Sequence, residues 1–269
     1  MIEINLDPNL LHLGPLLITW HGFFSAVGLG IGLWLTIALA SESSITADDI
    51  YTIALAAVPG GIVGARLLFA IENWHIFVNN PLGVLAINEG GISIYGAVIG
   101  GSLAGLIFAR FTKRPVPFIA DRGAIALIVG QGIGRIGDII NGEHHGLEAS
   151  DLPWSVTYTN PNTLAELGIP VHLAVGYEMV YDLVAGLILY WVLRRQPREG
   201  MTYVAYLFLY GLGRLWVGFY RKDVDVFMTL GMAQTLGLIS MVVGGIWFLA
   251  LWQGKAKTST RAQRRRGAA

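Results

Sequence analysis

Three arginines of this sequence lie within nearly continuous apolar runs, where a charged side chain is least expected. They are Arg66, Arg135 and Arg214. In a membrane helix each would cost about 2.5–3.5 kcal/mol on insertion scales, so each should face the interior of a helix bundle or a hydrated cavity. A guanidinium offers paired donors in a planar fork, which matches the oxygens of a phosphate group. The three arginines are therefore candidates for binding an anionic, phosphate-bearing ligand.

Other polar side chains occur near the ends of the apolar stretches and would complete such a site. They are His21, Tyr95, Asp138, Asn141, Glu143, Tyr177, Glu178 and Asp182. One interpretation is that the carboxylates among them neutralise individual arginines in structural ion pairs. Because the arginines and these polar groups come from several separate stretches, we favour a partly hydrated, anion-binding chamber. In a membrane, the abundant carrier of phosphate is the phospholipid headgroup.

The composition indicates that lipid surrounds these stretches. Hydrophobic residues make up 54% of the 269 positions and charged residues 13%, which is more apolar and less charged than a soluble globular domain. Small residues let membrane helices approach closely, and the 35 glycines fit this pattern. Four of them recur at helical spacing and predict a close helix crossing: Gly96, Gly100, Gly101 and Gly105. Because the chain has no cysteine, any thiol in its chemistry belongs to a substrate.

The apolar stretches predict an all-α, polytopic helix bundle with about seven transmembrane helices. A helix needs about 20 apolar residues to cross the hydrocarbon core of a membrane. The predicted spans are 17–40, 51–71, 92–110, 118–140, 175–193, 202–220 and 229–252. We expect residues 1–254 to form one transmembrane catalytic domain with a small external region at about 141–174, followed by a basic cytoplasmic tail at 255–269. Residues 1–15 lack the basic start of a signal peptide and are expected to lead into the first span from outside.

The distribution of lysine and arginine predicts the orientation. The tail at 255–269 holds six cations and no acid, and cytoplasmic loops carry the excess of cations in membrane proteins. We therefore expect the C-terminus to be cytoplasmic and the N-terminus outside. The segments 72–91 and 141–174, both predicted outside, contain no lysine or arginine, and only Arg221 and Lys222 depart from the rule. This orientation places the three arginines in the outer half of the bundle.

Two motifs that suggest other chemistry are discounted. The glycine-rich segment Gly130–Asp138 is similar to a dinucleotide-binding loop, but it lies in an apolar stretch and follows no strand. Four histidines lack the helical spacing to a third ligand that a metal site needs: His75, His144, His145 and His172. We expect no metal, no cofactor and no nucleic-acid partner.

A longer motif resembles a family signature. The segment Gly134–Gly146 reads Gly-Arg-Ile-Gly-Asp-Ile-Ile-Asn-Gly-Glu-His-His-Gly. It is similar to the signature of bacterial prolipoprotein diacylglyceryl transferases, Gly-Arg-x-Gly-Asn-Phe-x-Asn-x-Glu-x-x-Gly. Further matches follow in family order: Gly64-Ala65-Arg66, Gly90-Gly91-Ile92-Ser93, Asp121, Gln131, Tyr177-Glu178, Tyr210-Gly211 with Arg214 and Arg221, and Gly231-Met232-Ala233-Gln234. The family's seven-span topology, from outside to inside, agrees with the predicted one.

The resemblance implies a multi-pass enzyme of the bacterial plasma (inner) membrane. Such an enzyme transfers diacylglycerol from phosphatidylglycerol to the lipobox cysteine of a preprolipoprotein and releases glycerol phosphate. We assign Arg135 and Arg214 to the headgroup phosphate, where negative charge develops. Glu143 and Asn141 would orient the glycerol or these arginines. Arg66 would support the residues that bind the headgroup. The remaining residues expected at the substrate are Asp138, His21, Tyr177 and Glu178.

The sequence departs from the family pattern at four positions. Tyr95 stands in place of the histidine proposed as the base in many members, and Asp138 replaces the first asparagine of the signature. Gly218 replaces an acid, and His21 stands where a tyrosine is usual. Since a cysteine thiol has a reference pKa of about 8.5, a few per cent is already thiolate near neutrality. We therefore expect Tyr95 to position the headgroup or the thiol.

Two other functions compete with this interpretation. An anion or lipid transporter would also suit an arginine-lined chamber, but the sequence has no visible inverted repeat. An aspartyl intramembrane protease is suggested by Tyr181-Asp182 and Gly137-Asp138. It is disfavoured because Arg135 replaces the first glycine of the Gly-x-Gly-Asp motif that such proteases require.

Overall fold

The structure is a computed structural model that describes residues 1–14, 16–41, 44–86, 91, 93–223, 225–227 and 229–253. The basic tail predicted at 255–269 lies outside the described residues. The chain forms two compact units, the first from Met1–Gly28 with Leu127–Ala269 and the second from Leu29–Ala126.

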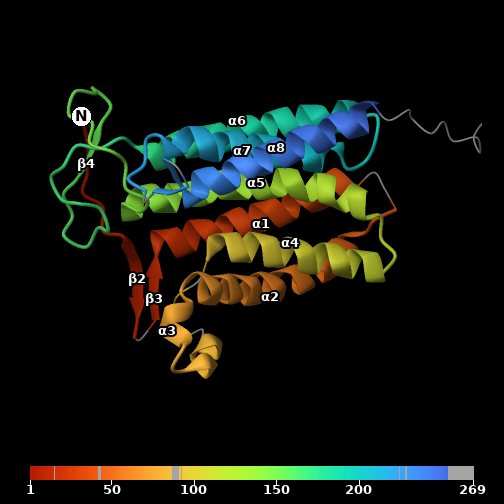
Figure 1. Ribbon diagram of the computed structural model, residues 1–269, viewed down its shortest axis with the longest axis horizontal. Coiled ribbons are helices and arrows are strands. Elements are labelled where there is room, and N and C mark those ends of the chain that lie inside the picture. Colours follow the sequence, from red (N-terminus) through yellow and green to blue (C-terminus); the bar gives the residue numbers. More distant parts are fainter. Residues whose placement is uncertain are drawn as a thin grey trace, which may run out of the picture. The chain divides into compact units, whose positions relative to one another are not determined.

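Helices dominate the described residues (Figure 1). The long ones are α1 (Trp20–Ala40), α2 (Ala47–Glu72), α4 (Ile94–Phe111), α5 (Val116–Asn141), α6 (Ala174–Arg195), α7 (Met201–Gly218) and α8 (Met232–Gln253). Two short ones, α3 (Trp74–Phe77) and η1 (Pro81–Leu85), follow α2. Each predicted span contains one long helix, which confirms the helical part of the prediction. Five of the helices are long and apolar enough to cross a membrane, and α4 is a shorter apolar helix.

Short strands occur in the connecting segments, so the prediction of helices alone was incomplete. The strands are β1 (Ile2–Ile4), β2 (Asn9–Leu13), β3 (Leu16–Thr19), β4 (Val156–Tyr158), β5 (Asp225–Phe227) and β6 (Leu230–Gly231). They form three two-stranded sheets: β1 pairs in parallel with β4, β2 with β3, and β5 with β6. Strands this short have too few residues to reveal an alternating pattern in the sequence. The β1–β4 pair ties the N-terminal segment to the 142–173 segment of the first unit.

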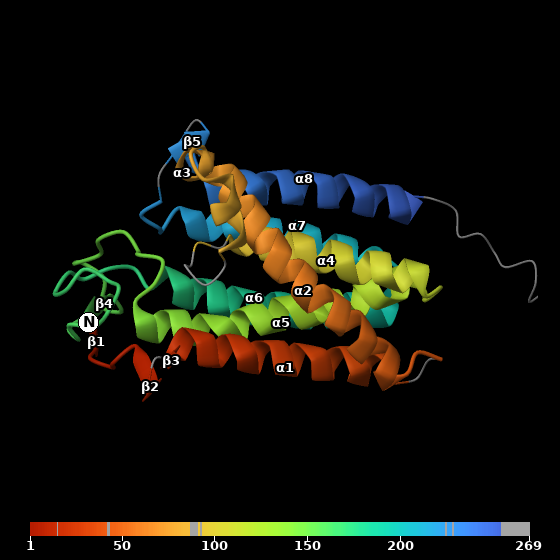
Figure 2. The same ribbon diagram turned by 90° about the horizontal axis from the view of Figure 1, so that it is seen from below.

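In the second unit, α2 and α4 pack side by side through facing glycines (Figures 1 and 2). A Cβ atom added at Gly100 would lie 2.5 Å from the carbonyl oxygen of Gly60 and 2.8 Å from the Cα of Gly64. Gly96 faces Gly64 in the same way. The backbones of the two helices therefore touch, as the glycine spacing predicts.

In the first unit, α5 lies along α6 (Figure 2), α6 packs against α7, and α7 packs against α8. A Cβ atom at Gly132 of α5 would lie 3.3 Å from the Cβ of Asp182 on α6. Gly211 of α7 faces the backbone of Gly237 and Met241 on α8. These close approaches bring the C-terminal end of α5, the N-terminal end of α6 and the C-terminal half of α7 together.

The glycine crossing predicts a steric effect of one added methyl group. Gly100→Ala should lower the stability of the second unit by about 1–3 kcal/mol, because the new Cβ meets rigid backbone atoms. Gly30→Ala is a matched control, since a Cβ atom at Gly30 meets nothing within 4 Å. The apparent unfolding temperature of each variant in detergent is the measurement. Equal unfolding temperatures for the two variants would contradict the prediction.

Candidate active site

The site begins where α5 ends. Gly142 has a positive φ of 73°, and the amide of Glu143 donates to the carbonyl of Asp138 at 3.0 Å. This is a Schellman helix ending, in which a left-handed residue turns the chain back over the last helical turn. His144 also has a positive φ, of 57°. The two left-handed residues bring Glu143 and His144 back toward Asp138.

Two of the predicted arginines share one buried carboxylate. Arg135 of α5 donates from Nη1 to Oδ2 of Asp138 at 2.6 Å, and from Nη2 to Oε1 of Glu178 at 2.8 Å. Arg214 of α7 donates from Nη1 to the same Oε1 at 2.5 Å. Glu178, near the start of α6, is only 1% exposed. One carboxylate therefore links three helices through two guanidinium groups.

Arg221 joins this cluster, although the sequence gave it no role beyond its place in the family order. Its backbone pairs with Gly146, because Leu147 donates to the carbonyl of Tyr220 and Lys222 donates to the carbonyl of His145, each at 2.9 Å. This pairing sets Arg221 Nη1 4.0 Å from Oε2 of Glu178. The sequence contained a signal, since Arg221 is one of the two cations that break the charge rule on the side predicted to be outside.

The cluster holds unpartnered donors of Arg135 and Arg221, and the unpartnered acceptor Oε2 of Glu178, among its described residues. Three guanidinium groups, those of Arg135, Arg214 and Arg221, surround the carboxylates of Glu178 and Asp138. Among the described residues, the buried Arg135 Nε and Arg221 Nη1 have no hydrogen-bond acceptor. The structural ion pairs considered from the sequence are thus present, but they leave positive charge and donors over. An anion such as a phosphate group matches that excess.

A second group of polar residues adjoins the first through Asp138. His21, in the first turn of α1, forms a hydrogen bond from Nδ1 to Oδ1 of Asp138 and lies 3.5 Å from Oε2 of Glu143. Asn141 donates to Oε1 of Glu143 at 3.0 Å. Ligand atoms of His21, Asp138 and Glu143 all lie within 4.8 Å of one another. That set suits a divalent cation by donor type alone, but Arg135 occupies the other oxygen of Asp138 and would repel one.

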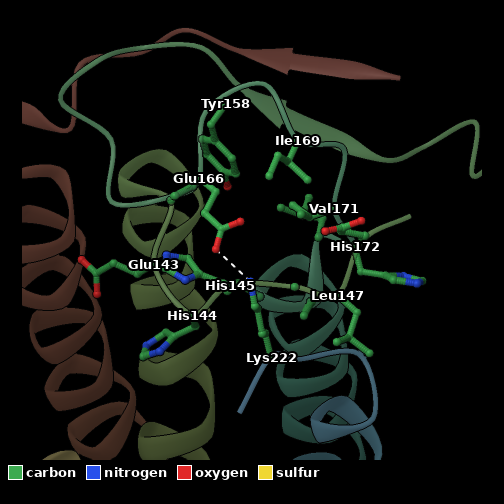
Figure 3. A pocket seen from close by; sticks show the side chains of 17 residues that line it. Glu143, His144, His145, Leu147, Tyr158, Glu166, Ile169, Val171, His172 and Lys222 are labelled. Carbon is green, nitrogen blue, oxygen red and sulfur yellow. Dashed lines mark hydrogen bonds and ion pairs between the residues drawn. The ribbon is translucent and has the colours of Figure 1, made fainter. Parts of the chain in front are cut away.

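A pocket of about 360 Å³ lies beside these residues in the first unit (Figure 3). Glu143 and His144 form part of its wall, and apolar side chains such as Ile169 and Val171 form another part. Glu166 and Lys222 point toward one another, joined by an ion pair at 2.8 Å (Figure 3). The polar cluster is therefore next to a space large enough for part of a ligand.

Comparison with known proteins identifies the group to which the chain is related. The family model described as prolipoprotein diacylglyceryl transferase matches residues 8–251. The chain belongs to this family. Curated proteins named phosphatidylglycerol–prolipoprotein diacylglyceryl transferase are similar along most of their length. One from Dehalococcoides mccartyi is 33% identical over 244 residues, which are 90% of this chain and 93% of the relative.

Relatives from other bacterial groups are equally similar. A protein of the same name from Clostridioides difficile is 33% identical over 229 residues, 85% of this chain and 88% of the relative. Another from Trichormus variabilis is 34% identical over 246 residues, 88% and 86% of the two chains. Family membership thus confirms the resemblance that the signature segment of α5 suggested.

The other residues predicted for the site have different surroundings. The hydroxyl of Tyr177 accepts from Nε1 of Trp154 at 3.1 Å and lies 3.2 Å from Nδ1 of His172, so it connects the 142–173 segment to the start of α6. Arg66 and Tyr95 belong to the second unit. There, Arg66 donates to four backbone carbonyls, those of Gly83, Val84, Ala86 and Gly91, at 2.7–3.0 Å. Tyr95 is half-buried in the first turn of α4.

His144 has an unusual electrostatic environment. Burial lowers its pKa to about 4, and the positive charges of Arg221 and Arg135 act in the same direction. Nη2 of Arg221 lies 3.2 Å from Nδ1 of His144, which fits a neutral imidazole that accepts at Nδ1. Asp138, whose Oδ2 lies 3.9 Å from Nε2, opposes the shift. His144 is therefore neutral near pH 7.

This lowered pKa predicts a pH dependence of stability. As the pH falls from 6.5 to about 4, the unfolded protein binds a proton at His144 that the folded protein does not, so stability is lost across that window. His144→Asn removes this contribution, keeps an acceptor for Arg221 and tolerates the positive φ. When the pH is lowered from about 7.5 to about 4.5, the unfolding temperature of the variant in detergent should fall by less than that of the wild type. Parallel losses in the two proteins would refute the lowered pKa.

Proposed function

We propose that this chain transfers the diacylglyceryl group of phosphatidylglycerol to a prolipoprotein, at the thiol of the lipobox cysteine. The family and the names of the relatives support the two substrates. The observation that carries the proposal is the excess of guanidinium donors around Glu178. Neither a transporter nor an aspartyl protease is supported by these comparisons.

The chemistry of the transfer suits this arrangement. A thiolate attacks the glycerol carbon bonded to the phosphate, the carbon–oxygen bond breaks, and negative charge develops on the departing phosphate oxygen. Arg135 and Arg214 donate to that oxygen and its neighbours, because preorganised donors act most strongly where charge develops. Glu178 holds both guanidinium groups in place before the lipid binds, and Arg221 adds a third cation.

The neighbouring residues take supporting roles in this proposal. Glu143 and Asn141 orient the headgroup glycerol, since their linked side chains lie next to Asp138. Arg66 holds the backbone at Gly83, Val84, Ala86 and Gly91 through its four carbonyl contacts. The hydroxyl of Tyr95 positions the headgroup or the thiol.

We also propose that all seven long helices span the bacterial plasma membrane, with the N-terminus outside and the C-terminus in the cytoplasm. The loop cations support this orientation. Under it, the end of α5, the start of α6 and the end of α7 lie on the outer side, together with residues 141–174. A secreted prolipoprotein and the outer leaflet would both have access to that side.

Reporter fusions test the orientation. A reporter active only in the cytoplasm should give a signal when fused after Trp252, and a reporter active only outside should give one when inserted within 141–174. The reason is the excess of lysine and arginine at the ends assigned to the cytoplasm. A cytoplasmic signal from the 141–174 segment would overturn the arrangement.

Loss of either phosphate-binding arginine should nearly abolish transfer. Arg135→Ala and Arg214→Ala should each lower the rate by roughly 10²–10³-fold, the usual effect of removing one donor at a developing oxyanion. Lysine at either position should rescue poorly, because it lacks the planar fork. The assay follows labelled phosphatidylglycerol and a lipobox peptide with purified protein in detergent.

Two features make this assay decisive. Arg194→Ala is the matched control, because Arg194 is an exposed arginine at the C-terminal end of α6. This variant should transfer the diacylglyceryl group at the wild-type rate. The products also separate the three functions, because diacylglyceryl-peptide, cleaved peptide and unchanged peptide are distinct. Near-normal transfer by well-inserted Arg135→Ala protein would mean that the phosphate binds elsewhere.

A further inference from the structure

We propose that His21, held by Asp138, is the base that accepts the proton of the acceptor thiol. This inference rests on the proposed transfer function and adds a catalytic residue to it. The sequence suggested only that His21 contacts the substrate. The geometry of the His21 ring assigns it a chemical step.

The first observation is the orientation of the ring. His21 Nδ1 is hydrogen-bonded to Oδ1 of Asp138, and the other oxygen of Asp138 is held by Arg135 at 2.6 Å. Asp138 is only 2% exposed, so this carboxylate is fixed and ionised by its arginine partner. A carboxylate at Nδ1 places the proton of the neutral ring on that nitrogen and leaves a lone pair on Nε2.

The second observation is access. The side chain of His21 is 44% exposed although its Nδ1 faces the buried Asp138. The ring is therefore anchored at Nδ1, while a large part of the side chain stays accessible. The same relation of a buried carboxylate, an imidazole and an accessible Nε2 serves as the general base in nucleophilic catalysis.

The third observation is the charge around the ring. The charged groups that face His21 are Asp138 and Arg135 from α5 and Glu143 from the segment that follows it. Two carboxylates close to Nδ1 favour the imidazolium that forms on proton uptake, and Arg135, paired to Asp138, opposes them more weakly. The two carboxylates therefore stabilise the protonated form of the His21 ring.

Packing explains why these groups meet although they are 117 residues apart in sequence. Gly137 of α5 lies against the backbone of Trp20 and His21, and a Cβ atom there would be 2.9 Å from the His21 amide nitrogen. Only glycine lets the start of α1 approach so closely. The next residue of α5, Asp138, then reaches the imidazole.

The proposed step balances as follows. The thiol proton moves to Nε2 of His21, and the sulfur lone pair forms the bond to the glycerol carbon as the carbon–oxygen bond to phosphate breaks. The released phosphate oxygen then takes the proton from the imidazolium. The products are the thioether and glycerol phosphate, and His21 returns to its neutral form.

The test is the pH–rate profile of His21→Gln with labelled phosphatidylglycerol and a lipobox peptide. Near neutral pH the rate should fall by about 10–30-fold, because only a few per cent of a thiol with a pKa of about 8.5 is ionised there without a base. It should recover as the pH rises toward the thiol pKa of about 8.5, because the thiol then ionises without help. His12→Gln is the matched control, since His12 is an exposed histidine on β2 of the same unit and should keep the wild-type profile.

A second variant covers the case in which His21→Gln does not insert or bind lipid. In His21→Ala, added imidazole should raise the rate at neutral pH in a concentration-dependent manner, because it enters the space of the lost ring. Asp138→Asn should also slow transfer, because the amide no longer stabilises the imidazolium, while binding of phosphatidylglycerol remains measurable.

The outcomes separate the two proposals. Wild-type protein that gives no diacylglyceryl-peptide refutes the transfer function, and the role of His21 falls with it. If the wild type transfers and His21→Gln matches it at neutral pH, the base assignment alone is wrong. A loss that is constant at all pH values, without rescue of His21→Ala by imidazole, also overturns the base role.

Discussion

The buried carboxylate of Glu178 is the interaction on which the site depends. It sits between guanidinium groups from α5 and α7 and faces a third from the segment after α7. Three cations at such short range would repel one another strongly without it. Removing one partner of a buried ion pair typically costs about 3–5 kcal/mol, because the remaining charge is left uncompensated. Glu178 therefore holds the arginines together, and an anionic ligand can take up the donors that it leaves over.

The backbone at the end of α5 supplies the remaining geometry. A Schellman ending at Gly142 and a left-handed His144 fold the chain over the last helical turn. The folded-back segment then pairs with residues 220–222, which carries Arg221 into the cluster. Positive φ at a non-glycine residue is uncommon and is found often at functional sites. Two local turns thus connect the cluster of arginines around Glu178 with the His21–Asp138 pair.

Glycine has a second use in this protein, as the residue that lets helix backbones touch. The α2–α4 crossing and the approach of α1 to α5 at Gly137 both require a missing side chain. In lipid, helices gain no hydrophobic free energy by associating, so close packing and polar contacts must stabilise the bundle. The same close approach that stabilises the fold also brings His21 within reach of Asp138.

The sequence by itself determined the helices and named most residues of the candidate site. Each long apolar stretch forms a helix, because a backbone in an apolar environment must satisfy its hydrogen bonds internally. Arginines in such stretches had to be functional or paired, and the signature at Gly134–Gly146 indicated the family. The short strands were missed, because they are set by pairing between distant segments such as β1 and β4.

Only the tertiary structure decided which groups act on one another. Glu178 forms ion pairs with both Arg135 and Arg214, whereas Arg66 binds backbone carbonyls. These partners depend on helix packing, which no local sequence pattern encodes. Arg221 enters the site through backbone pairing with Gly146, and His21 meets Asp138 because Gly137 allows the contact. The sequence supplied the charged groups, whereas long-range packing and left-handed turns fixed their partners, because both depend on residues far apart in the chain.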